Sequence, residues 1–268
     1  YLLIDEYDNF ANEILMHARP TGRAWHESLL RGVEPLKTIF KTVKAAAAGS
    51  GLDRVFITGV ASSAFSELTG GYNVAESLSL NPFYHELCGF IAADVKAALD
   101  AVVTECNLSA RDTDTAFTDL RQFCHGYRFT ELSETQLYNP ALVFSFLKRY
   151  QAAGTVQYHS LVNELALERN LLGVLVQLPG GKKLLVEATS NAPDVVASRL
   201  DMPYQAVDSL LAEQPREFIA SLLYHYGLLT LSGQRGLFAD FPLQIPNASM
   251  LKLFADQARL SLFSLAGA

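Results

Sequence analysis

Two adjacent carboxylates near the start of the chain have a spacing that suits chemistry on a bound cation. The chain opens "YLLIDEYDNF", so the apolar run Tyr1–Ile4 is followed directly by Asp5 and Glu6. An apolar run of this kind predicts a buried, parallel β-strand. Open α/β sheets bind their ligands outside the carboxyl ends of the strands. Two acids at such an end could hold a divalent cation and activate a water molecule.

The same residues have the pattern of a Walker B motif, in which a hydrophobic run of a P-loop ATPase ends in an acidic pair. In that role Asp5 would hold the Mg²⁺ that bridges the phosphates of ATP. Glu6 would orient and deprotonate the attacking water. Such runs are also common by chance. The alternative is that Asp5 and Glu6 begin a turn or cap the next helix.

A polar residue also ends the next apolar run, in the stretch "FITGVASS". Val55–Ile57 predicts a second short strand that ends at Thr58, with Ser62 and Ser63 close behind. In many ATPases of this class the residue at this strand end contacts the terminal phosphate or the attacking water. Thr58 is therefore a third candidate catalytic residue, and Ser62 is a candidate nucleotide contact. The alternative is a strand-end turn in which Thr58 bonds to nearby backbone.

A helix is predicted between these two strands. Apolar residues recur at helical spacing over Glu27–Ala48, and glycines follow. Two strands joined by a helix form a βαβ unit, whose strands are parallel. The remaining chain predicts further helices at Ala92–Glu105, Thr115–Cys124, Pro140–Tyr150 (after the N-cap Asn139), Ser160–Asn170, Tyr204–Glu213, Arg216–Tyr226 and from Ala248 onward.

Two stretches in the second half of the chain predict β-hairpins. The first is "LGVLVQLPGGKKLLVEA", with its turn at Pro179, Gly180 and Gly181. The second is "LLTLSGQRGLFADFPLQIPN", which predicts a strand, a tight turn and a strand. Helices followed by a terminal hairpin are typical of a winged-helix-like unit, a shape that also occurs in proteins that do not bind DNA.

Composition limits the classes of partner. The 21 basic and 28 acidic residues give a net charge of −7, which argues against a large nucleic-acid interface. The cysteines have neither metal-site spacing nor a disulfide framework, which favours a reducing, cytoplasmic compartment. No apolar stretch approaches the length of roughly 20 residues that spans a membrane. We therefore expect no membrane partner, and the charge does not support a nucleic acid as one.

Eight fragments occur in an order that resembles a known family. They are "LLIDEYDN", "RVFITGV", "GGYNVAESLSLNP", "ELCGF", "FCHGYRF", "LYNPALVFSFL", "SLLYHYGLLTL" and "IPN". Together they look like the AAA-ATPase-like family of bacteria, fungi and oomycetes, which is similar to STAND-type P-loop ATPases. Members often carry a restriction-endonuclease-like nuclease, and related modules occur in Crinkler-type effectors. The resemblance implies ATP and Mg²⁺ as cofactors and leaves open that the protein is a secreted effector.

Residue by residue, the resemblance implies that Asp5 and Glu6 are the Walker B acids and that Thr58 is the sensor-like residue. It also marks "HGYRF" and "YNP". Arg128 of the first motif could face a phosphate, since a fixed guanidinium suits that contact. The alternative is that both motifs are structural, with a glycine turn and aromatic packing in one and a helix start in the other. His125 is then a packed or surface histidine.

Two parts of the family pattern are missing. Nothing matches the phosphate loop Gly-x-x-x-x-Gly-Lys-Ser/Thr, and no nuclease follows "IPN". We therefore expect an α/β chain with three parts, in which 1–90 is an incomplete P-loop NTPase sheet, 91–158 is helical and 159–268 is winged-helix-like. The missing parts would lie in further segments or in a partner protein. Without a partner segment over the acidic pair, the edge of the sheet should be open to solvent, because buried unpaired carboxylates are costly.

The expected function is that of a regulatory ATPase module that couples Mg-ATP hydrolysis to the control of an attached effector or nuclease. The alternative is a catalytically inactive interaction or scaffold module that keeps its Walker B residues by descent. A third possibility is an α/β protein outside this family.

Overall fold

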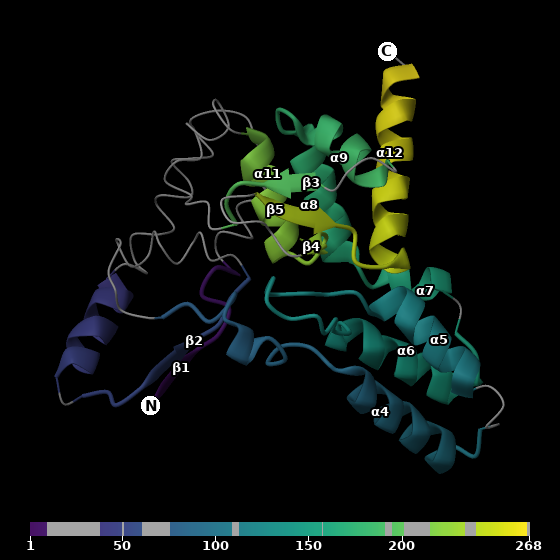
Figure 1. The fold of residues 1–268 in the computed structure, drawn as a ribbon, viewed down its shortest axis with the longest axis horizontal. Coiled ribbons are helices and arrows are strands. Elements are labelled where there is room, and N and C mark those ends of the chain that lie inside the picture. Colours follow the sequence, from purple (N-terminus) through teal and green to yellow (C-terminus); the bar gives the residue numbers. More distant parts are fainter. Residues whose placement is uncertain are drawn as a thin grey trace. The chain divides into compact units, whose positions relative to one another are not determined.

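The chain forms two compact units in the computed structural model, which describes residues 1–9, 38–49, 51–60, 76–108, 113–156, 158–190, 195–200, 215–233 and 240–266. The first unit comprises Tyr1–Glu76, Asn170–Leu184 and Ala197–Tyr226. The second comprises Ser77–Arg169, Leu185–Val196 and Gly227–Ala268. Figure 1 shows a mixed α/β chain, and its described residues form more helices than strands.

A parallel pair of strands begins the first unit, as the sequence predicts. Strand β1 (Leu2–Ile4) pairs with β2 (Val55–Ile57) in parallel, from Leu2 opposite Val55 to Ile4 opposite Ile57. Figure 1 shows the two arrows side by side. A helix covers 38–48, and the earlier part of the predicted helix lies outside the described residues.

The prediction that Tyr1–Ile4 forms a buried strand is wrong. Successive side chains of a strand point to opposite faces. Leu2 and Ile4 are half-buried, whereas Leu3 is 78% exposed and its partner Phe56 is 44% exposed. One face of the strand pair is therefore uncovered by the residues that the structure describes.

The first predicted hairpin is wrong, because its residues form two helices. Helix α8 spans Ala166–Gln177 and α9 spans Gly181–Thr189. The buried residues of α8 recur at helical spacing, which the apolar run concealed: Leu171, Leu172, Leu175 and Val176. Gly180 turns the chain with φ +84°, and a Cβ on Gly181 would lie 2.2 Å from the Leu175 carbonyl oxygen. The glycines therefore make a tight helix–helix corner.

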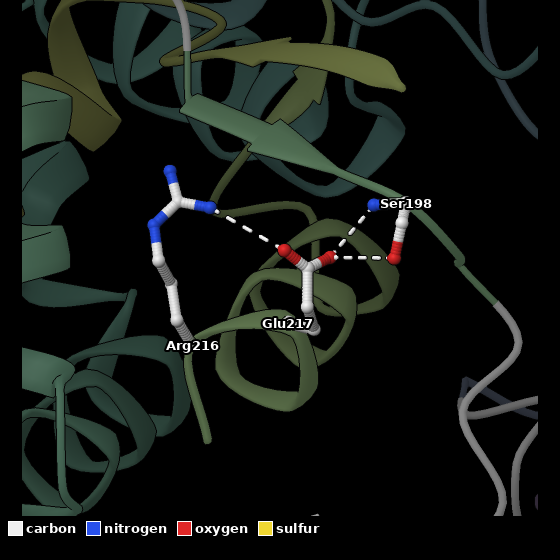
Figure 2. Close-up of polar contacts among 3 residues, drawn as sticks. All are labelled: Ser198, Arg216 and Glu217. Atoms are coloured by element: carbon white, nitrogen blue, oxygen red, sulfur yellow. Dashed lines mark hydrogen bonds and ion pairs between the residues drawn. The ribbon is translucent and has the colours of Figure 1, made fainter. Parts of the chain in front are cut away.

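Helix α11 (Pro215–His225) confirms the predicted helix at Arg216–Tyr226 and ends before Gly227, whose φ is +68°. Residues 218–224 are all buried. Figure 2 shows how its first turn is fixed: the Glu217 carboxylate accepts hydrogen bonds from the backbone N (2.6 Å) and Oγ (3.1 Å) of Ser198, and Arg216 lies beside it. The helix predicted at Tyr204–Glu213 lies outside the described residues.

The second unit contains a helical cluster. Its members are α4 (Ala92–Glu105), α5 (Thr113–Cys124), α6 (Pro140–Ala153), α7 (Tyr158–Asn163) and α12 (Ala248–Ala266). Helices α4, α5 and α6 pack against one another, and α12 contacts α5 and α7. The bounds of these helices agree with the predicted bounds to within a few residues. The exception is the predicted Ser160–Asn170 helix, whose residues are divided between α7 and α8.

A small sheet accompanies these helices. Its strands are β3 (Val195–Ala197), β4 (Thr230–Leu231) and β5 (Phe241–Gln244), in the order β3-β5-β4. The antiparallel pairing of β4 with β5 confirms the strands of the second predicted hairpin. Most of the connection between them lies outside the described residues. Strand β3 was not predicted, because three residues carry too little periodicity.

A short 3₁₀ helix, η1 (Pro82–Tyr84), precedes the helical cluster, and the Asn81 side chain caps it by accepting from the Phe83 N–H. Large apolar side chains project from this segment into solvent: Leu80, Phe83, Tyr84 and Leu87. Within the described parts of the chain, no helix has the length and hydropathy needed to cross a membrane.

Candidate functional site

The ends of β1 and β2 bring two predicted site residues together. The Thr58 hydroxyl donates a short hydrogen bond to Asp5 Oδ1, although the two residues lie 53 positions apart in the sequence. The backbone supports this pair, because Thr58 N donates to the Ile4 carbonyl at 2.8 Å and Tyr7 N donates to the Thr58 carbonyl at 3.3 Å. Parallel pairing places both carboxyl ends at one edge of the sheet, which is why residues so far apart meet.

Glu6 occupies a backbone conformation that is unusual for its residue type. Its φ is +53°, in the left-handed region that favours glycine. The Glu6 N–H donates to Asp5 Oδ1 at 2.9 Å, and the Glu6 carbonyl accepts from Asn9 N at 3.0 Å. Its side chain is exposed and has no hydrogen bond within the described part of the chain. The turn therefore presents the Glu6 carboxylate to solvent at the edge where Asp5 lies.

Asp8 is a part of this edge that the sequence analysis missed. It is 1% exposed, and its two carboxylate oxygens accept from the Val60 N–H at 3.2 and 3.1 Å. Gly59 makes this approach possible, because a Cβ there would lie 2.3 Å from the Tyr7 ring and 2.6 Å from Asp8 Oδ1. An acid three residues after Asp5 and a glycine directly after Thr58 were the available signals. We call Asp5, Glu6, Asp8, Thr58 and Gly59 the strand-end edge.

The strand-end edge offers one carboxylate oxygen that suits a cation. Both hydrogen bonds to Asp5 end on Oδ1, so Oδ2 has no protein partner within the described residues. Asp5 is also exposed, as expected for an edge open to solvent. The described residues contain no group of three or more His, Cys, Asp or Glu that could enclose a metal. Mg²⁺ in phosphoryl-transfer sites is often held by one or two carboxylates together with phosphates and water, so a single carboxylate suffices in principle.

Two further nucleotide contacts were predicted, Ser62 and Arg128. Ser62 lies outside the described residues. Arg128 belongs to the second unit, where the Thr230 hydroxyl accepts from Arg128 N at 2.8 Å and donates to the Arg128 carbonyl at 3.1 Å. The Arg128 Nε is buried without a hydrogen-bond partner. A nucleotide contact for Arg128 or Ser62 stays a prediction.

The motifs "HGYRF", "YNP" and "IPN" meet inside the second unit. The Asn139 backbone N donates to the Cys124 carbonyl at 2.8 Å, and Asn247 Nδ2 donates to the His125 carbonyl at 3.0 Å. The same two asparagines cap α6 and α12 through their Oδ1 atoms. Gly126 has φ +107°, and a Cβ there would lie 2.0 Å from the Pro246 carbonyl oxygen. We call Gly126, Tyr127, Asn139, Thr230 and Asn247 the motif junction.

Burial dominates the electrostatics of the motif junction. Desolvation raises the pKa of the Cys124 thiol to about 12 and lowers the pKa of His125, whose Nε2 donates to the Gln136 carbonyl at 3.0 Å. Burial also raises the pKa of the Tyr127 phenol, and the amides of Asn247 and Asn139 partly offset this. The Tyr127 hydroxyl nevertheless has no hydrogen bond of normal geometry. The pKa shifts of all three groups favour their neutral forms, which suits a structural role and supports the structural interpretation of the two motifs.

A groove of about 290 Å³ lies beside the helix at 38–48 in the first unit. Its lining is apolar apart from hydroxyl groups and includes no titratable side chain: Thr38, Ile39, Thr42, Val43, Ala46 and Leu52. It therefore offers shape but no acid–base chemistry, and the strand-end edge remains the candidate for chemistry.

Comparisons with known proteins assign no family to the chain. No protein-family model matches it, and no significant match was found among curated proteins or among solved structures.

Proposed function

We propose that the strand-end edge is the metal-binding and water-activating part of an ATP-hydrolysing site in an AAA-ATPase-like module. In this role Asp5 holds Mg²⁺, Glu6 activates water and Thr58 acts as the polar sensor of the terminal phosphate. The observation that carries the proposal is the hydrogen bond from Thr58 to Asp5 at the shared carboxyl end of two parallel strands. This is the place where open α/β sheets bind their ligands.

The exposure of the two acids supports this role. Asp5 keeps one oxygen available for a cation, and the Glu6 carboxylate reaches solvent, as a base that deprotonates water requires. The 268 residues contain no Gly-x-x-x-x-Gly-Lys-Ser/Thr loop. Most phosphate contacts in P-loop enzymes come from that loop, so we expect the affinity of this chain for nucleotide to be low. The proposed role of the complete module is to couple hydrolysis to the control of an attached effector or nuclease.

The order of elements in the second half of the chain supports the proposal of a winged-helix-like unit, and the burial of its helix α11 supports a structural role for it. Helices precede β3, α11 lies between β3 and β4, and the sheet order β3-β5-β4 puts the first strand beside the last, as in that class. Residues 218–224 of α11 are all buried, which leaves this helix little free surface for a DNA groove. Together with the net charge of −7, this favours packing over DNA recognition.

A non-catalytic interaction module is the second candidate function. The observation that favours it is the apolar surface near η1, where Phe83 is 94% exposed and Leu87 is 59% exposed. Large exposed apolar groups on a soluble protein often mark contacts with partners. In this alternative, Asp5 and Glu6 are remnants without turnover.

Metal binding and turnover distinguish the two candidates. Mn²⁺, a spectroscopic substitute for Mg²⁺, is titrated into the wild-type chain and into Asp5→Asn, Glu6→Gln and the control Asp53→Asn, and binding is followed by electron paramagnetic resonance. Asp53 is an exposed acid just before β2. ATP hydrolysis is then measured at saturating Mg²⁺ and high ATP concentration.

We expect Asp5→Asn to abolish Mn²⁺ binding and turnover, and Glu6→Gln to abolish turnover with Mn²⁺ binding retained. Asp53→Asn should behave as wild type. Equal Mn²⁺ binding by wild type and Asp5→Asn would contradict the proposed metal site. Mn²⁺ binding that depends on Asp5, without turnover even when a segment or partner that carries the phosphate loop is supplied, would favour the non-catalytic module.

A further inference from the structure

The buried carboxylate of Asp8 has the geometry of a support for the candidate site. A carboxylate that is 1% exposed is costly unless its charge is compensated by hydrogen bonds. Asp8 directs both oxygens at one backbone N–H, that of Val60, at 3.2 and 3.1 Å. The two contacts share one N–H and join the buried carboxylate to Val60, which lies two residues after Thr58.

The contacts around Asp8 link the segments that follow the two strands. On one side the chain turns back at Glu6, whose φ of +53° brings Tyr7 and Asp8 across the end of β2. On the other side Gly59 lacks the side chain that would collide with the Tyr7 ring. Thr58, whose hydroxyl bonds to Asp5, also accepts from Tyr7 N through its carbonyl, and Val60, which donates to Asp8, lies two residues further along.

We propose that Asp8 is a positioning residue of the strand-end edge, which holds Thr58 against Asp5 through the Val60 amide without touching metal or nucleotide itself. This inference rests on the proposed function, because the geometry that Asp8 maintains matters only if Asp5 binds a cation. It assigns the three acids of "DEYD" separate roles: Asp5 binds the cation, Glu6 activates water and Asp8 holds Thr58 in place against Asp5.

The loss of such supporting groups has a characteristic effect on metal sites. Removal of a residue that orients a metal ligand typically weakens metal binding by about 10- to 100-fold. Asp8→Asn keeps one oxygen that can accept from the Val60 N–H, whereas Asp8→Ala keeps none. We therefore expect Mn²⁺ affinity to fall slightly in Asp8→Asn and by about tenfold or more in Asp8→Ala.

Two measurements on the same variants test the inference. The first is Mn²⁺ affinity by electron paramagnetic resonance, at a temperature where thermal unfolding shows every variant to be folded. The second is amide hydrogen exchange by NMR, which needs no metal. It compares Thr58, Tyr7 and Val60 with the amides of α6 in the second unit. Gly59→Ala is a further variant, because its Cβ would collide with the Tyr7 ring and with Asp8 Oδ1 although the Asp8 side chain itself is kept.

We expect Asp8→Ala and Gly59→Ala to speed exchange at Thr58, Tyr7 and Val60 by about tenfold or more, with α6 unchanged and Asp8→Asn in between. Exchange that is unchanged, or accelerated equally throughout the chain, would overturn the positioning role. So would a lower melting temperature with unaltered Mn²⁺ affinity. If wild type itself does not bind Mn²⁺, the proposed function fails, and the exchange data still decide whether Asp8 holds Thr58 in place.

Discussion

The strand-end edge and the motif junction are built from similar polar residues, yet their hydrogen bonds go to different places. At the edge, Asp5 and Glu6 are exposed, and at least one oxygen of Asp5 is available for a ligand. At the junction, Asn139, Asn247 and Thr230 direct their polar groups to backbone atoms of neighbouring segments. The edge therefore keeps carboxylate oxygens available for a ligand, whereas the polar side chains of the junction link segments of the fold.

This difference shows why a family-like motif alone does not identify a site. "LLIDEYDN" and "HGYRF" both contain charged or aromatic residues of the kinds found at catalytic centres. Burial separates them, because buried polar groups must be satisfied by the protein and are then unavailable to a ligand. Variants of the two regions should show whether the motif junction is structural and whether the strand-end edge keeps a functional group that lowers the stability of the protein.

The largest effect is expected at the motif junction. Gly126→Ala should lower the free energy of unfolding by about 3 kcal/mol or more, because a Cβ at φ +107° would lie 2.0 Å from the Pro246 carbonyl oxygen. Urea unfolding followed by circular dichroism measures this change. Gly233→Ala is the matched control, since a Cβ there meets nothing within 4 Å. Equal stability of the two variants would show that the junction is not closely packed around Gly126.

The two capping asparagines should differ in their contributions. The Asn247 side chain caps α12 and also donates to the His125 carbonyl, so Asn247→Ala should cost about 2 kcal/mol of unfolding free energy. The Asn139 side chain caps α6, while its bond to Cys124 comes from the backbone and survives substitution. Asn139→Ala should therefore cost about 1 kcal/mol. Thermal unfolding of both variants checks the order, and the reverse order would contradict this description of the junction.

At the strand-end edge, a substitution that removes a candidate catalytic group should stabilise the protein. Glu6 has φ +53°, a left-handed conformation that glycine adopts without steric strain. Glu6→Gly should therefore raise the free energy of unfolding by up to about 1 kcal/mol. Turnover should be lost, because the carboxylate is gone. Asn107→Gly is the control at the other positive-φ residue, where φ is +51°, and it should be nearly neutral because asparagine tolerates this conformation. A destabilised Glu6→Gly variant would mean that the Glu6 side chain supports the fold.

The smallest effects concern two acids of the second unit whose pKa values shift in opposite directions. Burial raises the pKa of Glu168, so its ionisation disfavours folding and stability is lost as the pH rises above the usual 4.5. The Ser145 hydroxyl and the Arg149 guanidinium lower the pKa of Glu164, so its contribution is present above pH 4.5 and is lost as the pH falls.

Melting temperatures at pH 7 and pH 4 test this contrast. Glu168→Gln should raise the melting temperature at pH 7 and have less effect at pH 4. Glu164→Gln should lower the melting temperature slightly at pH 7. The corresponding loss of unfolding free energy should be less than about 1 kcal/mol, because the ion pair with Arg149 is largely exposed. Its effect should fade toward acid pH. Shifts of the same sign in both variants at pH 7 would refute the assignment.

Local signals in the sequence were sufficient for most helices and for the strand pair. Asn139 followed by Pro140 marks the start of α6, and Gly227 marks the end of α11. The apolar runs at Leu2–Ile4 and Val55–Ile57 predicted the parallel pair of strands. These features depend on propensities of neighbouring residues, which a sequence displays directly. The apolar run around Pro179 failed as a predictor, because a short run fits both a strand and a buried helix.

By itself, therefore, the sequence determined most of the local elements and indicated Asp5 and Thr58 as residues of one candidate site. Only the tertiary structure decided that their side chains meet, that Asp8 is buried and that Glu6 has a left-handed backbone. It also decided that the conspicuous "HGYRF" and "YNP" motifs hold segments together. The physical reason is that burial and hydrogen-bond partners depend on which distant segments approach one another, and residue types alone do not specify that approach.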